Sequence, residues 1–146
     1  MEDIKDILIK LILSSVLCGA IGAERGIRHK NAGLRTHILV GIGSTLITLT
    51  SFYIFAILKN EAVMDPTRII SSIITGIGFL CGGTIIRGGM NVVGLTTAAT
   101  MWVVSAIGIA VGCGQYTAAI LVTITVLVIL VFLRSVEMML DKHFNK

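Results

Sequence analysis

Five long apolar runs constrain what this sequence can fold into more than any other feature. A helix that crosses about 30 Å of hydrocarbon needs roughly 20 residues, or about 17 when the fit is tight. The runs cover residues of about 7–23, 38–58, 69–86, 97–113 and 118–133. They lack the alternation of a lipid-exposed barrel, and backbone amides in lipid must be bonded within their own segment, which excludes strands there. We therefore predict a single all-α domain, an integral membrane bundle of five transmembrane helices.

The composition agrees with a membrane protein. Of 146 residues, 55% are hydrophobic and only 14% are charged, and the mean hydropathy is +0.95. A soluble domain keeps about a quarter of its residues charged. These values exclude a soluble enzyme, a disordered tail and a secreted disulfide scaffold. The formal charge of +4 is too small to indicate nucleic-acid binding.

The sequence shows no pattern typical of catalysis. The three cysteines fall inside apolar runs without Cys-x-x-Cys spacing, so they indicate neither a metal site nor a redox motif. Neither a nucleophile–base arrangement nor a phosphate-binding P-loop is present. We expect no enzymatic activity and no bound cofactor.

Basic residues indicate the orientation. An odd number of spans places the termini on opposite sides, and the connector 24–37 is the most basic one. The positive-inside rule then places this connector and the C-terminus in the cytoplasm and the N-terminus outside. The acidic start, residues 1–6, is unlike a signal peptide, so the first run is read as a retained span. The basic residues on the cytoplasmic side would be Arg25, Arg28, Lys30, Arg35, Arg87, Arg134, Lys142 and Lys146.

Several residues are candidates for helix starts. Asp65-Pro66 places an N-cap acceptor before a proline at the first helical position of the third span. Thr36 is expected to cap the second span, and Thr96 or Thr97 the fourth.

Small residues recur at four-residue spacing in the spans. Gly78 with Gly82 form one stripe, and Gly108 with Gly112 form another. Small residues let helix backbones approach closely in lipid. We expect packing inside one compact bundle, with contact between copies of the chain as the alternative.

Several motifs carry a resemblance to a known family. Residues 30–37 read KNAGLRTH, residues 94–102 read GLTTAATMW, and residues 65–68 read DPTR. Together with Gly22-x-Glu24-Arg25 and the run 76–80 (GIGFL), these motifs resemble the signature of the MgtC/SapB family of bacterial membrane proteins. The motifs follow one another in the same order over nearly the whole chain.

The resemblance implies a multi-pass protein of the bacterial inner membrane. It also implies a link to magnesium homeostasis, to growth in low Mg²⁺ and to stress or virulence, with members viewed as modulators of other membrane proteins. Two departures stand out: Asn31 replaces a usual proline, and Cys81-Gly82 replaces a usual glycine–alanine pair. Larger members carry a cytoplasmic ACT-like domain after the bundle, which we do not expect in this chain.

The acidic residues argue against a magnesium site in the membrane. Mg²⁺ binds octahedral oxygen ligands and relies on carboxylates. Glu24 and Asp65 lie at span ends predicted on opposite sides, and no acid lies in the middle of a span. Asp65 is interpreted as a helix cap, with Arg68 as its neighbour on the first turn. A pore lined by backbone carbonyls of the glycine pairs at 82–83 and 88–89 remains an alternative.

A weak internal repeat relates the two halves of the first four spans. A shift of 61 residues aligns Gly22 with Gly83 and the segment 33–36 with 94–97, in which three of the four positions are identical. We hypothesise two parallel helical hairpins about an axis along the membrane normal, Ile7–Leu58 and Ile69–Cys113, with the fifth span added outside.

The repeat would bring the N-termini of the second and fourth spans together at the inner face. Helix N-termini carry partial positive charge and unbonded amides, which suit an anion. A lipid phosphate or an acidic segment of a partner is the hypothesised ligand; the alternative is that the arginines only hold topology. The candidate binding cluster is Glu24, Arg25, Arg28, Arg35, Thr36, His37, Arg87, Thr96 and Thr97.

Two members of this cluster have structural interpretations as well. Glu24 and Arg28 are four residues apart and are expected to pair on one helix face. His37 is interpreted as an interfacial capping residue rather than a metal ligand, because it has no His or Cys partner close in sequence.

These observations favour a modulator that contacts membrane lipids, anionic ones included, and other integral membrane proteins, with a homo-oligomer as a further option. The alternative is a transporter or channel for Mg²⁺ or another small solute.

Overall fold

The computed structural model describes residues 3–58, 65–89 and 91–144, and the side chains of all of these except residues 135–138 and 140–144. The five helices are α1 (Ile4–Ile27), α2 (Leu34–Leu58), α3 (Thr67–Thr84), α4 (Leu95–Gly112) and α5 (Tyr116–Phe144). Two short strands, β1 (Ile86–Gly88) and β2 (Asn91–Val93), lie between α3 and α4. All five helices include a stretch that is long and apolar enough to span a membrane, which confirms the five predicted spans.

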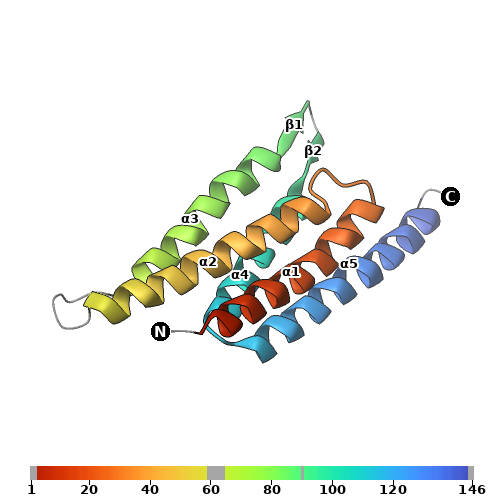
Figure 1. The fold of residues 1–146 in the computed structure, drawn as a ribbon. Helices are drawn as coiled ribbons and strands as arrows, with labels where there is room; N and C mark the ends of the chain where they lie inside the picture. Colours follow the sequence, from red (N-terminus) through yellow and green to blue (C-terminus); the bar gives the residue numbers. More distant parts are fainter. Residues whose placement is uncertain (1–2, 59–64, 90, 145–146) are drawn as a thin grey trace.

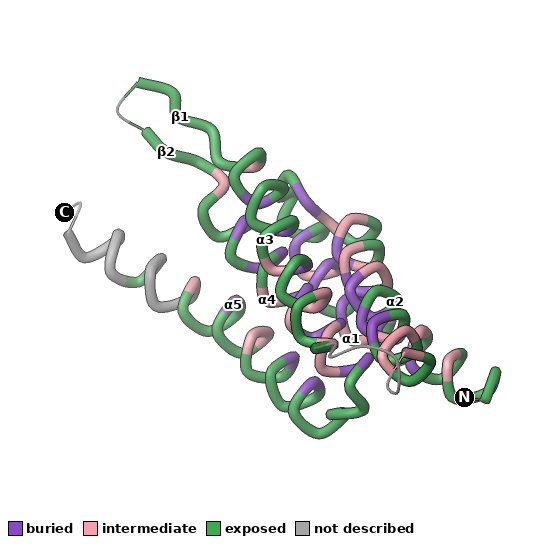
Figure 2. Tube along the Cα trace, turned by 90° about the vertical axis from the view of Figure 1, so that its left-hand side faces the viewer, coloured by how far each residue is buried: buried purple, intermediate pink, exposed green. Residues whose placement is uncertain are grey.

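The helices form a bundle with a packed centre and two peripheral members. The central helices α1, α2 and α4 pack on one another, while α3 packs on α4 and α2 and α5 packs on α1 and α4 (Figure 1). Buried residues gather on the three central helices, whereas α3 and α5 are largely exposed (Figure 2). Exposed apolar side chains on α5 suit contact with lipid.

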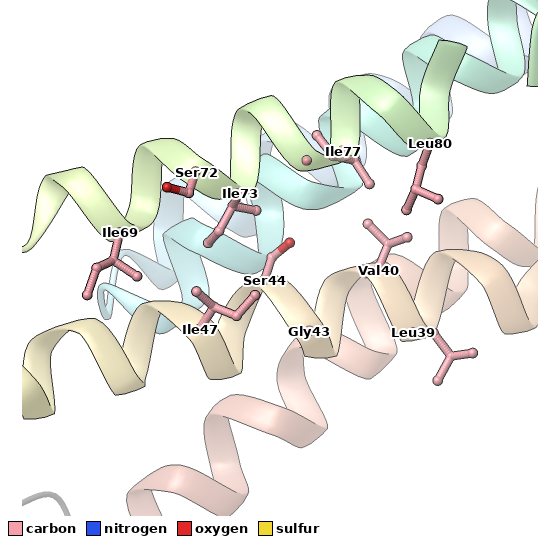
Figure 3. Close-up of a pocket in the computed structure, with 11 residues that line it drawn as sticks. Leu39, Val40, Gly43, Ser44, Ile47, Ile69, Ser72, Ile73, Ile77 and Leu80 are labelled. Atoms are coloured by element: carbon pink, nitrogen blue, oxygen red, sulfur yellow. The ribbon is translucent and has the colours of Figure 1, made fainter. Parts of the chain in front are cut away.

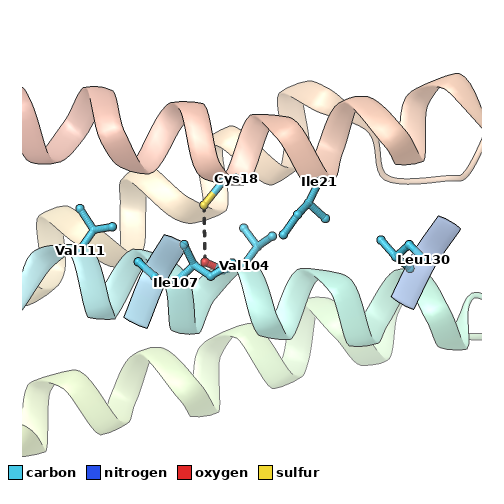
Figure 4. Packing of buried hydrophobic residues seen from close by; sticks show 7 residues of the cluster. Cys18, Ile21, Val104, Ile107, Val111 and Leu130 are labelled. Atoms are coloured by element: carbon cyan, nitrogen blue, oxygen red, sulfur yellow. Dashed lines mark hydrogen bonds between the residues drawn. The ribbon is translucent and has the colours of Figure 1, made fainter. Parts of the chain in front are cut away.

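The apolar core lies between α1 and α4 and is closed by α5. Its members include Cys18 and Ile21 on α1, Val104 and Ile107 on α4 and Leu130 on α5 (Figure 4). The Cys18 thiol donates to the carbonyl oxygen of Val104 over 3.7 Å. This hydrogen bond gives the buried thiol a partner and joins α1 to α4 through two residues that lie 86 positions apart in the chain.

The connection between α3 and α4 differs from the prediction. The third span was expected to reach residue 86, but α3 ends at Thr84 and Ile86 lies in β1. The strands β1 and β2 pair antiparallel, with Ile86 opposite Val93. The backbone of Gly89 is left-handed (φ 62°), as a tight hairpin requires, so the glycines here form a turn rather than extend the helix.

The two ends of the bundle differ in chemistry. The loop 28–33 and the hairpin β1–β2 lie at one end (Figure 1), where Arg134 on α5 lines a pocket together with Lys30; we call this the basic end. The start of α3, with Asp65 beside it, lies at the opposite end. Glu24, near the end of α1, and Asp65 are therefore on opposite ends of the bundle, as predicted.

Candidate functional site

A seam of buried hydroxyl groups runs between α1, α2 and α4. The Oγ1 atom of Thr45 lies 2.9 Å from Ser14 Oγ, from the Gly41 carbonyl oxygen and from the Gly108 carbonyl oxygen. Ser44 Oγ donates to Ser105 Oγ over 3.3 Å. These hydroxyls are buried, so the hydrogen bonds satisfy groups that would be costly to leave unpaired in lipid.

Glycines allow the seam to close. A Cβ atom at Gly108 would lie 2.5 Å from the Gly41 carbonyl oxygen, and one at Gly112 would lie 2.7 Å from Thr48 Cβ. A Cβ atom at Gly41 would collide with the Cys18 thiol. The Gly108–Gly112 stripe therefore packs inside the bundle, as predicted.

A buried lysine lies at the end of the seam where α4 ends. Lys10 on α1 is 7% exposed, and its Nζ donates to the Gly112 carbonyl oxygen over 3.1 Å. Because the last carbonyls of α4 carry partial negative charge, a cation is stabilised here. Its positive charge opposes a second cation at this end of the seam.

The basic end contains the predicted ion pair and one that the sequence reasoning missed. Glu24 Oε1 lies 3.5 Å from Arg28 Nε, which confirms the expected pairing of these two residues. Arg25 Nε lies 2.6 Å from Glu24 Oε2, and Arg25 is only 3% exposed. Burial of Arg25 therefore depends on Glu24, whose charge the two arginines balance.

His37 lies inside the bundle, near the start of α2. Its side chain is fully buried, with Nδ1 2.8 Å from the Gly33 carbonyl oxygen and Nε2 3.2 Å from Thr100 Oγ1. A carbonyl oxygen only accepts, so Nδ1 donates to Gly33, while the single hydroxyl hydrogen of Thr100 has both His37 Nε2 and the Thr97 carbonyl oxygen, 2.9 Å away, within reach. The imidazole therefore links the start of α2 to α4.

The predicted threonine caps are wrong. α2 begins at Leu34 and α4 at Leu95, each directly after a glycine, so Thr36 and Thr97 are the third residues of their helices and Thr96 the second. Gly94 is the N-cap of α4, with a left-handed backbone (φ 94°), and a Cβ atom there would collide with the Thr84 carbonyl oxygen. The capping position thus needs a glycine because α3 ends against it.

The other members of the predicted cluster are not brought together. Arg35 is exposed near the start of α2, and Arg87 is exposed on β1, opposite Val92. A pocket at the basic end instead includes Arg25 and Thr96 together with Lys30 and Arg134, two residues that the candidate cluster left out.

Although Pro66 is the N-cap and Thr67 the first helical residue, one position later than predicted, Asp65 accepts hydrogen bonds at the start of α3. Its Oδ1 accepts from the backbone N–H of Thr67 over 2.8 Å and from the Thr67 hydroxyl over 2.7 Å, and Arg68 lies on the same turn. These hydrogen bonds, the hydroxyl one first, hold the pKa of Asp65 below its ordinary value. The stabilisation is therefore present at neutral pH and is lost as the pH falls through the folded-state pKa.

The sequence contains a pattern from which the polar face of α2 could have been predicted. Ser44, Thr48 and Ser51 on α2 are spaced by four and three residues, which places them on one helix face. A polar face within an apolar span indicates contact with another helix rather than with lipid. The partners on α4 cannot be chosen from this spacing.

The described residues do not form a metal centre. Among the residues that the structure describes, no three His, Cys, Asp or Glu side chains group closely enough to hold a metal ion.

A lateral groove separates α3 from α2. Its cavity of about 470 Å³ lies between Ile69, Ile73 and Leu80 on α3 and Val40 and Ile47 on α2 (Figure 3). The lining is almost entirely apolar, so it suits hydrocarbon.

The Gly78–Gly82 stripe on α3 does not pack inside the bundle, contrary to the prediction. Both glycines are exposed, and a Cβ atom added at either would meet nothing within 4 Å. Ser71 and Thr75 are exposed on the same face. α3 packs through Ile73, Ile77 and Cys81 instead, so the glycines point away from the chain.

The fold and the polar seam define a multi-pass membrane protein built around three tightly packed central helices. The model of the MgtC family matches residues 11–139. The chain belongs to this family, as its motifs indicated.

Two named relatives give the extent of the similarity. The "Putative magnesium transporter YhiD" of Escherichia coli K12 is 44% identical over 143 residues, which cover 96% of this chain and 66% of the relative. "Protein MgtC" of Salmonella typhimurium LT2 is 43% identical over 125 residues, 85% of this chain and 51% of the relative. The chain thus spans between half and two thirds of these relatives. No solved structure matches it.

Proposed function

We propose that this protein modulates other membrane proteins by direct contact within the bacterial inner membrane, in physiology linked to magnesium supply, low-Mg²⁺ growth or stress and virulence. The basic end faces the cytoplasm and the N-terminus faces outward, following the positive-inside rule. The protein has no enzymatic activity and no resident cofactor. Family membership and the names of the relatives support the link to magnesium.

The observation that carries this proposal is the closed seam between α1, α2 and α4. Thr45 bonds to both neighbouring helices, and Gly108 brings the α4 backbone against the α2 backbone. A hydrated Mg²⁺ needs a wide, oxygen-rich path, because the ion loses its water reluctantly. Packing of this kind favours a structural role for the seam.

The charges along α1 support the same proposal. Buried Lys10 and buried Arg25 lie near the two ends of the central packing. The Gly112 carbonyl oxygen at Lys10 and the Glu24 carboxylate at Arg25 hold these cations in place. The acid near Arg25, Glu24, is already engaged by two arginines.

The contact surface of the proposal is the outer face of α3. Its exposed small residues, Ser71, Thr75, Gly78 and Gly82, allow the backbone of another helix to approach closely. The partner is an integral membrane protein; a second copy of this chain is the other occupant that this face admits.

A transporter for Mg²⁺ or another small solute is the second candidate. The name of the YhiD relative favours it. Carbonyl groups near Gly82 and Gly83 are the oxygen ligands that an oligomeric pore would use, since both residues are exposed.

Magnesium flux into proteoliposomes tests the proposal. The purified protein is reconstituted with a Mg²⁺-sensitive dye inside, next to empty liposomes and liposomes that contain an established Mg²⁺ channel. We expect uptake equal to that of empty liposomes. Saturable uptake that is altered in a Ser44→Ala or Thr45→Val variant would contradict the closed seam and favour the carrier.

A further inference from the structure

A pocket of about 300 Å³ lies at the basic end, where the loop after α1, the start of α4 and the body of α5 meet. Its polar lining consists of Arg25, Lys30, Thr96 and Arg134. Each side chain comes from a different part of the chain. Three of the four are cations, and the acids of the described chain do not line it.

The local backbone fixes two of these cations beside each other. His29 has a left-handed backbone (φ 52°), its N–H donates to the Gly26 carbonyl, and the N–H of Lys30 donates to the Arg25 carbonyl over 3.0 Å. This pattern ends a helix in a Schellman motif. The chain therefore turns back over α1 and places Lys30 near Arg25.

Arg25 is suited to a ligand although it is paired. Its guanidinium has five N–H donors, and the bond to Glu24 uses the one on Nε. The side chain is 3% exposed, so its position is fixed before a ligand arrives. Glu24 also contacts Arg28, so it does not cancel the charges of Lys30 and Arg134.

The start of α4 adds to the positive potential. Thr96 is the second residue of this 18-residue helix, whose first N–H groups have no partner within the helix. The positive end of the helix dipole therefore points toward the pocket region, and the threonine hydroxyl supplies a donor. The start of α4 and the three cations therefore border the same pocket, and all of them contribute positive potential to it.

The remaining wall is apolar. Ile129, Leu130 and Leu133 of α5 line it, and they precede Arg134 by five, four and one positions. A cationic side next to an apolar side matches the level in a membrane where a phosphate headgroup meets its acyl chains.

We propose that this pocket binds a phosphate group through Arg25, Lys30, Thr96 and Arg134. The planar guanidinium group of arginine and the compact ammonium group of lysine both bind phosphate oxygens. An anionic phospholipid and free phosphate share this chemistry, and the pocket does not depend on whether the chain transports an ion or contacts a partner.

Binding to the purified protein in neutral detergent tests the proposal. Thermal unfolding is followed while phosphatidylglycerol, phosphatidylcholine or inorganic phosphate is added. We expect phosphatidylglycerol or inorganic phosphate to raise the unfolding midpoint in a saturable manner, and phosphatidylcholine to raise it least. The lipid arm and the phosphate arm identify the source of the ligand.

Charge-matched variants separate the pocket from general surface charge. Lys30→Gln and Arg134→Gln each remove one lining cation and should weaken binding about tenfold. Arg35→Gln and Arg87→Gln remove an exposed arginine outside the pocket and should leave affinity unchanged. Equal weakening by all four variants, or no saturable shift with either phosphate ligand, would overturn the proposal.

Discussion

Two glycines set how closely α2 and α4 approach. At Gly108 a Cβ atom would lie 2.5 Å from the Gly41 carbonyl oxygen and 2.9 Å from Ser44 Cβ, distances at which the backbone must move. Gly43 lies on the same helix as Gly41, but a Cβ atom there would meet nothing within 4 Å. The close approach of α2 and α4 therefore depends on Gly41 and Gly108, and not on Gly43.

Replacing Gly108 or Gly43 by alanine should therefore change the free energy of unfolding in different ways. Gly108→Ala should lower the free energy of unfolding by about 1–3 kcal/mol, because the added methyl group overpacks the seam. Gly43→Ala should leave it unchanged or raise it by up to about 1 kcal/mol, because alanine favours helix. Denaturant titration of both variants in mixed micelles measures the difference; equal stability of the two would contradict tight packing at Gly108.

At the residue scale, sequence reasoning works where partners are close in the chain. The Glu24–Arg28 pair and the Asp65 cap are local, so spacing alone predicts them. His37 and Thr100 are 63 residues apart, and only the packing of α2 on α4 brings them together. For the same reason, the sequence does not predict that His37 is buried against α4.

At the scale of elements, α3 is a helix whose outer face is not used by the described part of the chain. It packs through Ile73, Ile77 and Cys81, while Gly78 and Gly82 face outward. Lipid gives no hydrophobic push between helices, so a close-packing face has value only where another helix fits it. A glycine also lowers helix stability, which makes two exposed ones costly without such a contact.

Bulky substitutions on α3 test this contact. A Gly78→Leu/Gly82→Leu variant should fold as the parent does, because neither added side chain meets another part of the chain. In a bacterial strain that needs this protein for growth in low Mg²⁺, we expect the variant to lose growth support completely, because helix–helix approach is blocked.

The control is Ala118→Leu, which adds similar bulk to an exposed position on α5. This variant should support growth as the parent does at equal expression. Full growth with the α3 double variant would show that the outer face of α3 is not a contact surface.

The span boundaries predicted from the sequence lie within about four residues of the helix ends, except that α5 continues to Phe144, and the errors at the starts of α2 and α4 have one cause. Hydroxyl residues were taken as caps, whereas the chain enters α2 and α4 from Gly33 and Gly94. The His37 N–H bonds the Gly33 carbonyl and the Ala98 N–H bonds the Gly94 carbonyl, so both helices begin at the glycine. The hairpin β1–β2 was missed because the apolar run extends into it.

At the scale of the whole molecule, the hypothesised repeat stays a prediction, and two features of the structure share its offset. α2 begins at Leu34 and α4 at Leu95, which is the predicted offset of 61 residues. Ser44 and Ser105 are related by the same offset and bond to each other where α2 meets α4. In a pair of related hairpins, equivalent residues meet only at the axis, so this bond indicates where an axis would lie.

Sequence reasoning did not predict that the centre of the bundle is polar and yet closed. Hydropathy identifies spans but averages over Ser14, Thr45 and Lys10, whose hydrogen bonds depend on the arrangement of three helices. These hydrogen bonds and the close approach at Gly108 close the seam between the three helices.

Native cysteines provide the most direct test of the closed seam. Cys18 lies within it and is fully buried, whereas Cys113 is exposed directly after α4. The thiolate is the reactive form, and partial burial raises the pKa of Cys113, so labelling is done at mildly alkaline pH. The protein is placed in lipid nanodiscs, where both faces meet water, and treated with a small water-soluble maleimide; each site is then quantified by peptide mass spectrometry. The closed seam predicts that Cys113 is modified and that Cys18 is modified only after denaturation. Modification of Cys18 in the native protein at a rate similar to that of Cys113 would show that water reaches the seam and would contradict it.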